Sequence, residues 1–133
     1  MQWIAPVVIA IGIILPVSII KEPNRRFLMA ILLGGAGAAY LSGGGFGKWE
    51  LAFCAAISFC SYLGLRSYSL IGIGWLLHTA WDILHHLYGN PILAFDATSS
   101  LGCAICDPVI AVWCFAGAPS LYEAVRRRRA ILG

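Results

Sequence analysis

The sequence predicts an all-α integral membrane protein, a single domain over residues 1–133 built as a bundle of about five transmembrane helices. Composition is the first observation: 60% of the 133 residues are hydrophobic, only 11% are charged, and the mean hydropathy is +0.84. Soluble domains carry roughly 25% charged residues. The second observation is that five apolar runs approach the roughly 20 residues that a membrane-spanning helix needs.

The five runs differ in how clearly they predict a helix. The first lacks a positively charged flank, so we expect it to be retained and not cleaved as a signal peptide. The second is rich in glycine and alanine, which lets membrane helices approach closely. The fourth contains all three histidines, and the fifth is the weakest because Pro119 interrupts it. In chain order they cover residues of about 3–20, 27–42, 49–65, 70–88 and 103–125.

The distribution of basic residues supports the fifth helix. Lys and Arg near the ends of membrane helices stay on the cytoplasmic side. Five crossings place eight of the nine basic residues on one side and only Lys48 on the other, whereas four crossings divide them four to five. We therefore expect a multi-pass protein of the inner (cytoplasmic) membrane, with its N-terminus outside and its C-terminus in the cytoplasm.

The expected partners follow from this topology. The lipid bilayer is the main one, and the basic run Arg126–Arg129 is expected to bind anionic lipid headgroups. Ser120 and Glu123 fit a capping box, which predicts a helix after Pro119. A homo-oligomer is compatible with the sequence. The net charge of +3 comes mostly from that one arginine run, so we expect no binding of nucleic acid.

Polar side chains gather on the predicted fourth helix. His78, Asp82 and His86 are spaced i, i+4, i+8, and His85 follows His78 by seven residues. These spacings place the four side chains on one helix face. An ionisable group within a membrane is costly and faces the bundle interior, where it is a functional residue by default.

Further ligand-type residues fall at the same end of the predicted bundle. Glu50 starts the third run, and Cys103, Cys106 and Asp107 start the fifth. Imidazole, thiolate and carboxylate groups are the ligand set of zinc and, in other geometries, of copper or iron. We therefore predict a metal site near the outer face, with zinc as the first choice and copper or iron behind it. The predicted metal ligands are Asp82, His85, His86, Cys103, Cys106 and Asp107.

The leading functional hypothesis is a metal-dependent enzyme that acts on a lipid-soluble substrate. Glu50 and His78 are the candidates for the catalytic acid or base, because a metal site with an open position can activate water near neutral pH. Two functional alternatives stay open. Cys103 and Cys106 resemble the active-site pair of a quinone-linked thiol-disulfide oxidoreductase. The polar face is also compatible with a metal or proton conduit, or with an accessory subunit of a membrane complex.

A purely structural interpretation uses the same residues. Asp107 precedes Pro108, so it fits the N-cap of a helix that begins with proline. His85 and His86 fit a role in capping carbonyl groups at a helix C-terminus. Asp82 fits a role in pairing with a histidine to hold two helices together.

Four segments resemble a family of small bacterial polytopic membrane proteins that is defined only as a domain of unknown function. The resemblance covers nearly the whole chain and implies a membrane fold, but it implies no activity. The acid-and-histidine helix is also distantly similar to those of membrane zinc hydrolases such as alkaline ceramidases, as an analogy only. The four segments are Lys21-Glu-Pro-Asn-Arg-Arg26, Gly35–Gly44, Gly74–Pro91 and Thr98–Asp107.

Overall fold

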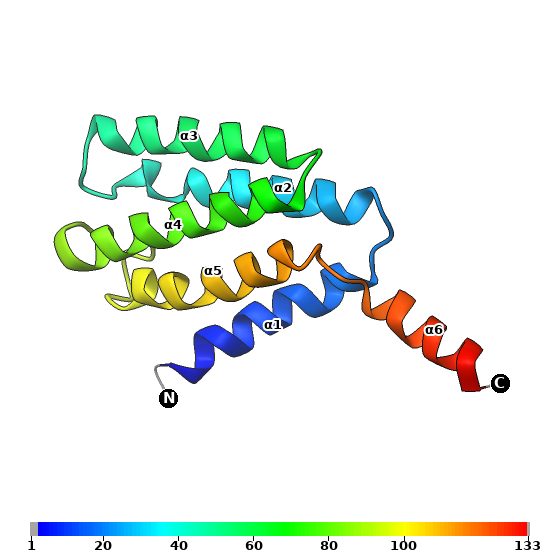
Figure 1. The fold of residues 1–133 in the computed structure, drawn as a ribbon. Coiled ribbons are helices and arrows are strands. Elements are labelled where there is room, and N and C mark those ends of the chain that lie inside the picture. The colour runs from blue at the N-terminus through cyan, green and yellow to red at the C-terminus, as the bar shows by residue number, and fades with distance from the viewer. Residues whose placement is uncertain (1–2, 133) are drawn as a thin grey trace.

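The computed structural model describes residues 3–132, which form six α-helices and one 3₁₀ helix, with no strand among them. The all-α class predicted from the sequence is therefore confirmed. Figure 1 shows the order of the helices along the chain. They are α1 (Ile4–Ile19), α2 (Asn24–Gly37), η1 (Ala39–Ser42), α3 (Lys48–Gly64), α4 (Tyr68–Tyr88), α5 (Ser99–Phe115) and α6 (Leu121–Leu132).

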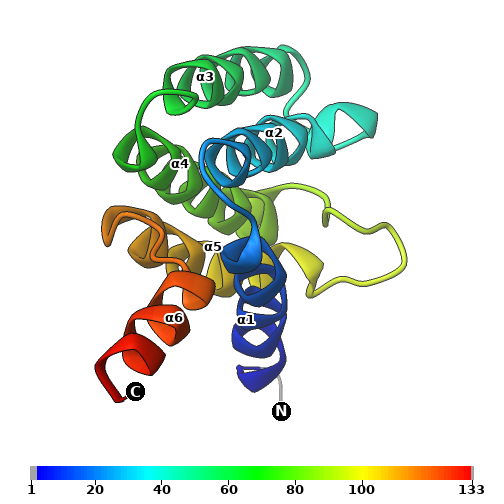
Figure 2. The same cartoon turned by 90° about the vertical axis from the view of Figure 1, so that its right-hand side faces the viewer.

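Helices α1 to α5 alternate in direction along one long axis, and α6 projects from one end (Figure 1). Helix α4 has a central place: it packs against α5, α3 and α2, and its contact with α5 is the most extensive in the protein. Helix α1 packs mainly on α5, so that the view along the axis shows α2 and α3 on one side of α4 and α1 on the other (Figure 2). A polar residue on α4 can therefore meet side chains from three other helices.

The apolar core runs through the whole bundle. Each of the five long helices contributes at least one fully buried side chain, namely Ala10, Leu33, Ile57, Ile71 and Ala111. Glycines allow this close packing. A Cβ on Gly37 would lie 2.5 Å from the side chain of Ile57, and a Cβ on Gly74 would collide with Leu33. The expectation that small residues bring these helices together is confirmed for Gly37.

Helices α1, α2 and α5 are shorter than the apolar runs that predicted them, whereas α3 and α4 are not. Helix α2 ends at Gly37, and the rest of the second run forms η1. Helix α5 ends at Phe115, well before the predicted end near residue 125. Helices α1, α2, α3 and α5 contain 14–17 residues. At 1.5 Å per residue this gives about 21–26 Å, which is less than the hydrocarbon thickness of about 30 Å.

Only α4, with 21 residues, is longer, and it contains Asp82 and all three histidines. Within residues 3–132, no helix combines the length and the apolar character needed to cross a membrane. This finding contradicts the predicted bundle of transmembrane helices. It also contradicts the multi-pass location in the inner membrane and the assignment of the two termini to opposite sides.

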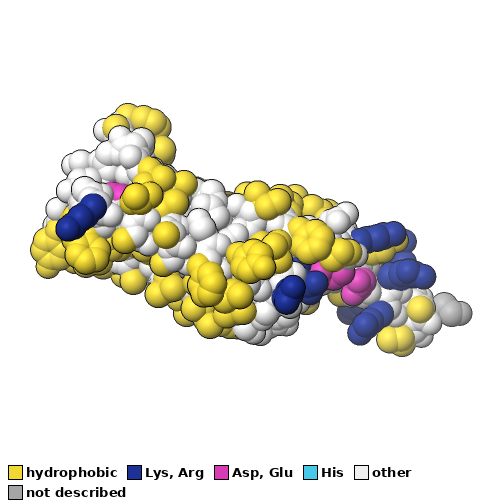
Figure 3. Space-filling view, turned by 90° about the horizontal axis from the view of Figure 1, so that it is seen from above, with side chains coloured by type: hydrophobic (Ala, Val, Ile, Leu, Met, Phe, Trp, Pro, Cys, Tyr) yellow, Lys and Arg dark blue, Asp and Glu magenta, His cyan; other side chains and the backbone are white. Residues whose placement is uncertain are grey.

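Charged side chains lie mainly toward the ends of the molecule. Figure 3 shows apolar side chains along the middle of the bundle and most of the visible Lys and Arg side chains near the projecting α6. Large apolar side chains are exposed on several helices, including Ile4, Ile31, Leu51 and Val112. The ionisable groups that are buried therefore stand out from an otherwise apolar bundle.

Helix α6 begins as the sequence predicts. The Ser120 hydroxyl accepts a hydrogen bond from the Glu123 N–H at 3.2 Å, as expected of an N-cap. Arg126–Arg129 are all exposed on this helix. Their binding to anionic lipid headgroups stays a prediction, as does the formation of a homo-oligomer.

Candidate metal centre

Helices α4 and α5 bring one histidine and two aspartates together in the interior. His78 and Asp82 lie one turn apart on α4, and Asp107 faces them from α5. The three residues are 1%, 0% and 4% exposed, respectively. Each offers one ligand atom, and these atoms lie within 4.8 Å of one another. The three residues therefore form a group that could hold a metal ion.

The Nδ1 atom of His78 is the centre of this group. It lies 2.9 Å from Oδ2 of Asp82 and 2.8 Å from Oδ2 of Asp107. On the other side of the ring, Nε2 lies 2.9 Å from the backbone carbonyl oxygen of Ala36 in α2. Because a carbonyl oxygen only accepts hydrogen bonds, Nε2 must hold a hydrogen and donate it. The ring orientation is therefore fixed, and Nδ1 faces the two carboxylates.

Two states of Nδ1 are compatible with this arrangement. Either Nδ1 also holds a proton, which makes His78 an imidazolium between two acceptors, or its lone pair and both carboxylates face a shared cation. A histidine that donates one ring N–H to a backbone carbonyl while its other nitrogen binds the ion is the usual arrangement at metal sites. The group of His78, Asp82 and Asp107, called the cation cluster below, is thus built to surround a positive charge.

The charge balance of the cation cluster also favours binding of a positive charge. With an imidazolium and two carboxylates the buried cluster keeps one negative charge, and an uncompensated buried charge costs several kcal/mol. Burial lowers the pKa of His78, but the hydrogen bonds to Asp107 and Asp82 outweigh it and raise that pKa to about 10. Burial raises the pKa of Asp107 to about 7 against the opposing effect of His78. In the metal-free protein, protons therefore compensate the excess negative charge.

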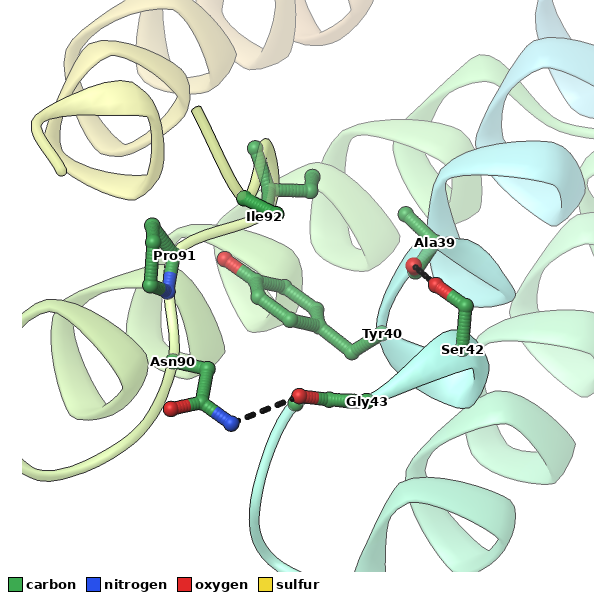
Figure 4. Close-up of a pocket in the computed structure, with 9 residues that line it drawn as sticks. Ala39, Tyr40, Ser42, Gly43, Asn90, Pro91 and Ile92 are labelled. Atoms are coloured by element: carbon green, nitrogen blue, oxygen red, sulfur yellow. Dashed lines mark hydrogen bonds between the residues drawn. The ribbon is translucent and has the colours of Figure 1, made fainter. Parts of the chain in front are cut away.

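Tyr40 orients the second aspartate from η1. Its hydroxyl donates to Oδ1 of Asp82 at 2.7 Å and accepts from the Ser100 hydroxyl, also at 2.7 Å. The Ser100 hydroxyl in turn accepts the backbone N–H of Ile92 at 3.0 Å. Figure 4 shows the Tyr40 ring between η1 and the segment Asn90–Ile92, beside a surface cavity of about 250 Å³. Burial raises the pKa of Tyr40, so its hydroxyl stays protonated and serves as a donor.

A second buried histidine lies farther along α4. Nδ1 of His85 donates to the carbonyl oxygen of Trp81 at 2.9 Å, and Nε2 lies 2.8 Å from Oε1 of Glu50 in α3. The Glu50 carboxylate also accepts the backbone N–H of Phe46 and the indole N–H of Trp81, both at 3.2 Å. The Tyr40 ring stacks on His85 with a centroid distance of 3.6 Å. Glu50 and His85 thus form a one-to-one pair, called the Glu50–His85 pair below.

Gly44 closes this pair from the loop after η1. A Cβ on Gly44 would collide with Oε1 of Glu50 and would lie 2.6 Å from Nε2 of His85. The Gly44 carbonyl oxygen accepts the Asn90 backbone N–H at 2.8 Å, and the Asn90 side chain donates to the Gly43 carbonyl oxygen at 2.8 Å (Figure 4). The loop backbone is therefore held against the pair, and only glycine fits without displacement.

The other predicted site residues lie apart from the cation cluster or at its edge. His86 is exposed, and no hydrogen bond of its side chain occurs within residues 3–132. Cys103 and Cys106 line a cavity beside His78 and Asp107, and both are free thiols. Burial, reinforced by the charges of Asp82 and Asp107, raises the pKa of each thiol to about 12. Neither cysteine therefore has thiolate character near neutral pH in the metal-free protein.

The structure also tests the purely structural roles that the sequence suggested for these residues. Asp107 is not an N-cap, because α5 begins eight residues earlier at Ser99 and Pro108 lies inside the helix. His85 contacts the carbonyl group of Trp81, which lies seven residues before the end of α4 at Tyr88, so it does not cap the C-terminal carbonyl groups of the helix. Asp82 pairs with a histidine, as that interpretation expected, but with His78 of its own helix.

Sequence reasoning did not find three contributors to the site. Tyr40 lies in the second apolar run, Ser100 precedes the fifth, and the Ala36 carbonyl is a backbone group. A usable signal for Tyr40 existed, because it is a large hydroxyl-bearing side chain within a run of glycine and alanine. The carbonyl of Ala36 leaves no signal in the sequence.

Comparison with known proteins gives one match. Residues 1–120 match a family of unknown function, DUF6010, and the chain belongs to this family. No curated protein and no solved structure matches the chain. The resemblance to a domain of unknown function is confirmed, whereas the bacterial origin of that family stays a prediction.

Proposed function

We propose that this member of the DUF6010 family is a metal-dependent enzyme whose divalent ion is held by His78, Asp82 and Asp107. The observation that supports the proposal is the cation cluster itself: three buried ligand atoms face one point, and the opposite ring nitrogen of His78 is committed to a backbone carbonyl. A divalent ion bound to one neutral imidazole and two carboxylates brings the buried charge to zero. Without a metal ion, two protons must bind, one to His78 and one to a carboxylate, to bring the charge of the cluster to zero.

Zinc would fit the cluster after a small expansion of the ligand positions. Zinc binds histidine nitrogen and carboxylate oxygen at about 2.0–2.2 Å, so tetrahedral ligands lie about 3.3 Å apart. The two Nδ1–Oδ2 distances are 2.9 Å and 2.8 Å, so each would lengthen by roughly half an ångström. Tyr40 and the Ala36 carbonyl would hold Asp82 and His78 in place, as second partners of metal ligands do.

The number of protein ligands favours a catalytic site over a structural one. Structural zinc sites have four protein ligands, whereas catalytic sites have three and leave one position for water or a substrate oxygen. An ion there would polarise that oxygen and lower the pKa of a bound water to about 7. His78, Asp82 and Asp107 would bind and orient the ion, and the buried position would exclude bulk water from it.

The thiol-disulfide alternative has less support. A redox-active cysteine needs a low pKa so that the thiolate can attack. The raised pKa of Cys103 and Cys106, together with the two neighbouring carboxylates, favours the unreactive thiol form. The two thiols are better suited to form the wall of the adjoining cavity.

Metal content tests the proposal. The wild-type protein and the variants Asp107→Asn, Glu50→Gln and Cys103→Ser are stripped with a chelator, loaded with zinc, dialysed and measured by mass spectrometry of the metal. We expect close to one zinc per chain in the wild type, Glu50→Gln and Cys103→Ser, and background levels in Asp107→Asn. Wild-type protein without stoichiometric zinc would overturn the proposal. Loss of metal in Cys103→Ser would indicate that Cys103 is a metal ligand.

A further inference from the structure

A partly open cavity adjoins the cation cluster. The cavity, of about 490 Å³, lies between α1, α4, α5 and the segment 92–99. This volume is within the range of about 300–1,000 Å³ typical of small-molecule sites. Most of its wall is apolar, with contributions from Pro6, Ile9 and Ile13 of α1 and from Leu101 and Ile110 of α5. The cavity therefore suits the apolar part of a ligand.

Polar residues line the cavity in two places: Asp96, Thr98 and Ser99 lie on the side of the 92–99 segment, and a second group lies at the cation cluster. His78 and Asp107 line the cavity, so two residues of the cation cluster reach its wall, and Cys103 and Cys106 lie beside them. A ligand in the cavity would thus have its apolar part along α1 and α5 and one polar group at the cation cluster. Sites of this kind combine apolar walls with a few polar groups that orient the ligand.

The charge of the cluster decides what kind of polar group fits. An ion held by one neutral imidazole and two carboxylates has no net charge left to balance an incoming anion. A carboxylate or phosphate head group would bring an uncompensated negative charge into a buried site, which is costly. A hydroxyl or carbonyl oxygen brings none and can still occupy the open metal position.

We propose that the cavity between α1 and α5 binds a long apolar molecule with one uncharged oxygen head group, an alcohol, aldehyde, ketone or ester, and that its oxygen meets the ion of the cation cluster. The inference rests on the proposed metal site, whose substrate class it names.

One segment of the cavity wall is connected to the cation cluster by hydrogen bonds. Ile92 and Leu93 line the cavity, and their backbone N–H groups donate to the hydroxyls of Ser100 and Ser99, both at 3.0 Å. Ser100 continues through Tyr40 to Asp82. The cavity wall and the metal ligands thus belong to one hydrogen-bonded unit, which keeps the ligand and the ion in a fixed relation.

Equilibrium binding of labelled 1-decanol and labelled decanoate tests the inference. With zinc-loaded wild-type protein we expect saturable binding of one decanol, at least tenfold tighter than decanoate. In Asp107→Asn, which lacks the ion, decanol should bind at least tenfold more weakly. Ile9→Trp should block decanol while it retains zinc, because Ile9 is an exposed residue on the cavity wall.

A matched control comes from the same helix. Ile11 is also exposed but does not line the cavity, so Ile11→Trp should bind both zinc and decanol like the wild type. Gly102→Leu provides a second block from α5, because a Cβ there meets only Pro6, at 3.9 Å. Circular dichroism and zinc content confirm that each variant is folded.

The outcomes separate the two proposals. Zinc binding without decanol binding, or decanol binding unchanged in Ile9→Trp and Gly102→Leu, overturns the ligand inference and leaves the metal site intact. Decanoate bound as tightly as decanol overturns the choice of an uncharged head group. Absence of zinc from the wild type overturns the proposed function and, with it, the inference that a head group meets the ion.

Discussion

The two buried histidines of α4 are alike in sequence and differ in what surrounds them. His78 and His85 lie seven residues apart, both are 1% exposed, and both contact carboxylates. His85 meets one carboxylate, which also accepts hydrogen bonds from the N–H groups of Phe46 and Trp81. His78 meets two carboxylates at a single ring nitrogen. The first arrangement matches one imidazole with one carboxylate, whereas the second matches one imidazole with two carboxylates.

The difference shows that a histidine next to an acid is not by itself a metal site. The Glu50–His85 pair matches one carboxylate with one imidazole and accepts hydrogen bonds from neighbouring N–H groups, so it stabilises the junction of α3, α4 and the loop after η1. The cation cluster has an excess of negative charge, which an added cation can relieve.

Removal of a carboxylate should have the largest and most unequal effect on stability. Glu50→Ala leaves the N–H groups of His85, Phe46 and Trp81 without an acceptor, so we expect a loss of about 3–5 kcal/mol in the free energy of unfolding. Asp107→Asn removes one of two mutually repelling carboxylates, so the metal-free protein should lose less than about 1 kcal/mol. Chemical denaturation in the presence of a chelator measures both. Equal losses would contradict the contrast.

Gly44→Ala tests how tightly the Glu50–His85 pair is enclosed. The added methyl group would collide with both members of the pair, so we expect a loss of about 1–3 kcal/mol. Gly35→Ala is the control: it lies in α2 with open space around the added Cβ, and alanine should stabilise this helix by about 0.5–1 kcal/mol. Thermal denaturation of both variants gives the comparison. If Gly44→Ala leaves the stability unchanged, the Glu50 and His85 side chains can move away from the added methyl group.

Tyr40→Phe tests the residue that touches both groups. The variant keeps the ring stacked on His85 but removes the hydroxyl that donates to Asp82. We expect zinc affinity to fall by about 10–100-fold, the usual cost of losing a partner behind a metal ligand. Competition with a zinc chelator of known affinity measures the change. Unchanged affinity would show that Tyr40 does not position Asp82.

The response to pH is the most gradual effect, at most about 1.4 kcal/mol per pH unit for each group. The pKa of Asp107 is raised to about 7 and that of His78 to about 10 in the folded protein. Both groups bind protons more tightly when folded, so metal-free stability should fall from about pH 4 to 7 through Asp107 and from about pH 6.5 to 10 through His78.

Denaturation series at several pH values, with a chelator present, check this expectation. In Asp107→Asn the decline between about pH 4 and 7 should be reduced, because that carboxyl no longer titrates. Zinc should offset the decline in the wild type, since it replaces the protons. Metal-free stability that rises through this range would contradict the assignment of Asp107.

The sequence predicted the helices and the meeting of several site residues, but not the details of the site. Glu50, Asp82 and Asp107 were expected at one end of the bundle, and the structure buries all three near the α4 histidines. The prediction that all four polar side chains of α4 share one helix face was wrong for His86. At about 100° per residue, His85 lies about 20° from His78 around the helix axis, whereas His86 lies about 80° away. His86 is exposed for this reason.

The membrane prediction failed because composition does not fix where a helix ends. Apolar runs of nearly the required length are divided by the break at Ala38 and by the turn at Gly117, which has a φ of +83°. The start of α5 was missed for a related reason. Ser99 and Ser100 are polar residues typical of a loop, yet they form the first turn of the helix that holds Asp107.

Anomalous scattering at the zinc absorption edge, measured on crystals of the zinc-loaded protein, tests the central claim most directly. We predict one strong peak about 2.0–2.2 Å from Nδ1 of His78 and from a carboxylate oxygen of both Asp82 and Asp107. Zinc bound only at the surface, for example at His86, or no zinc peak beside Nδ1 of His78, would contradict the account.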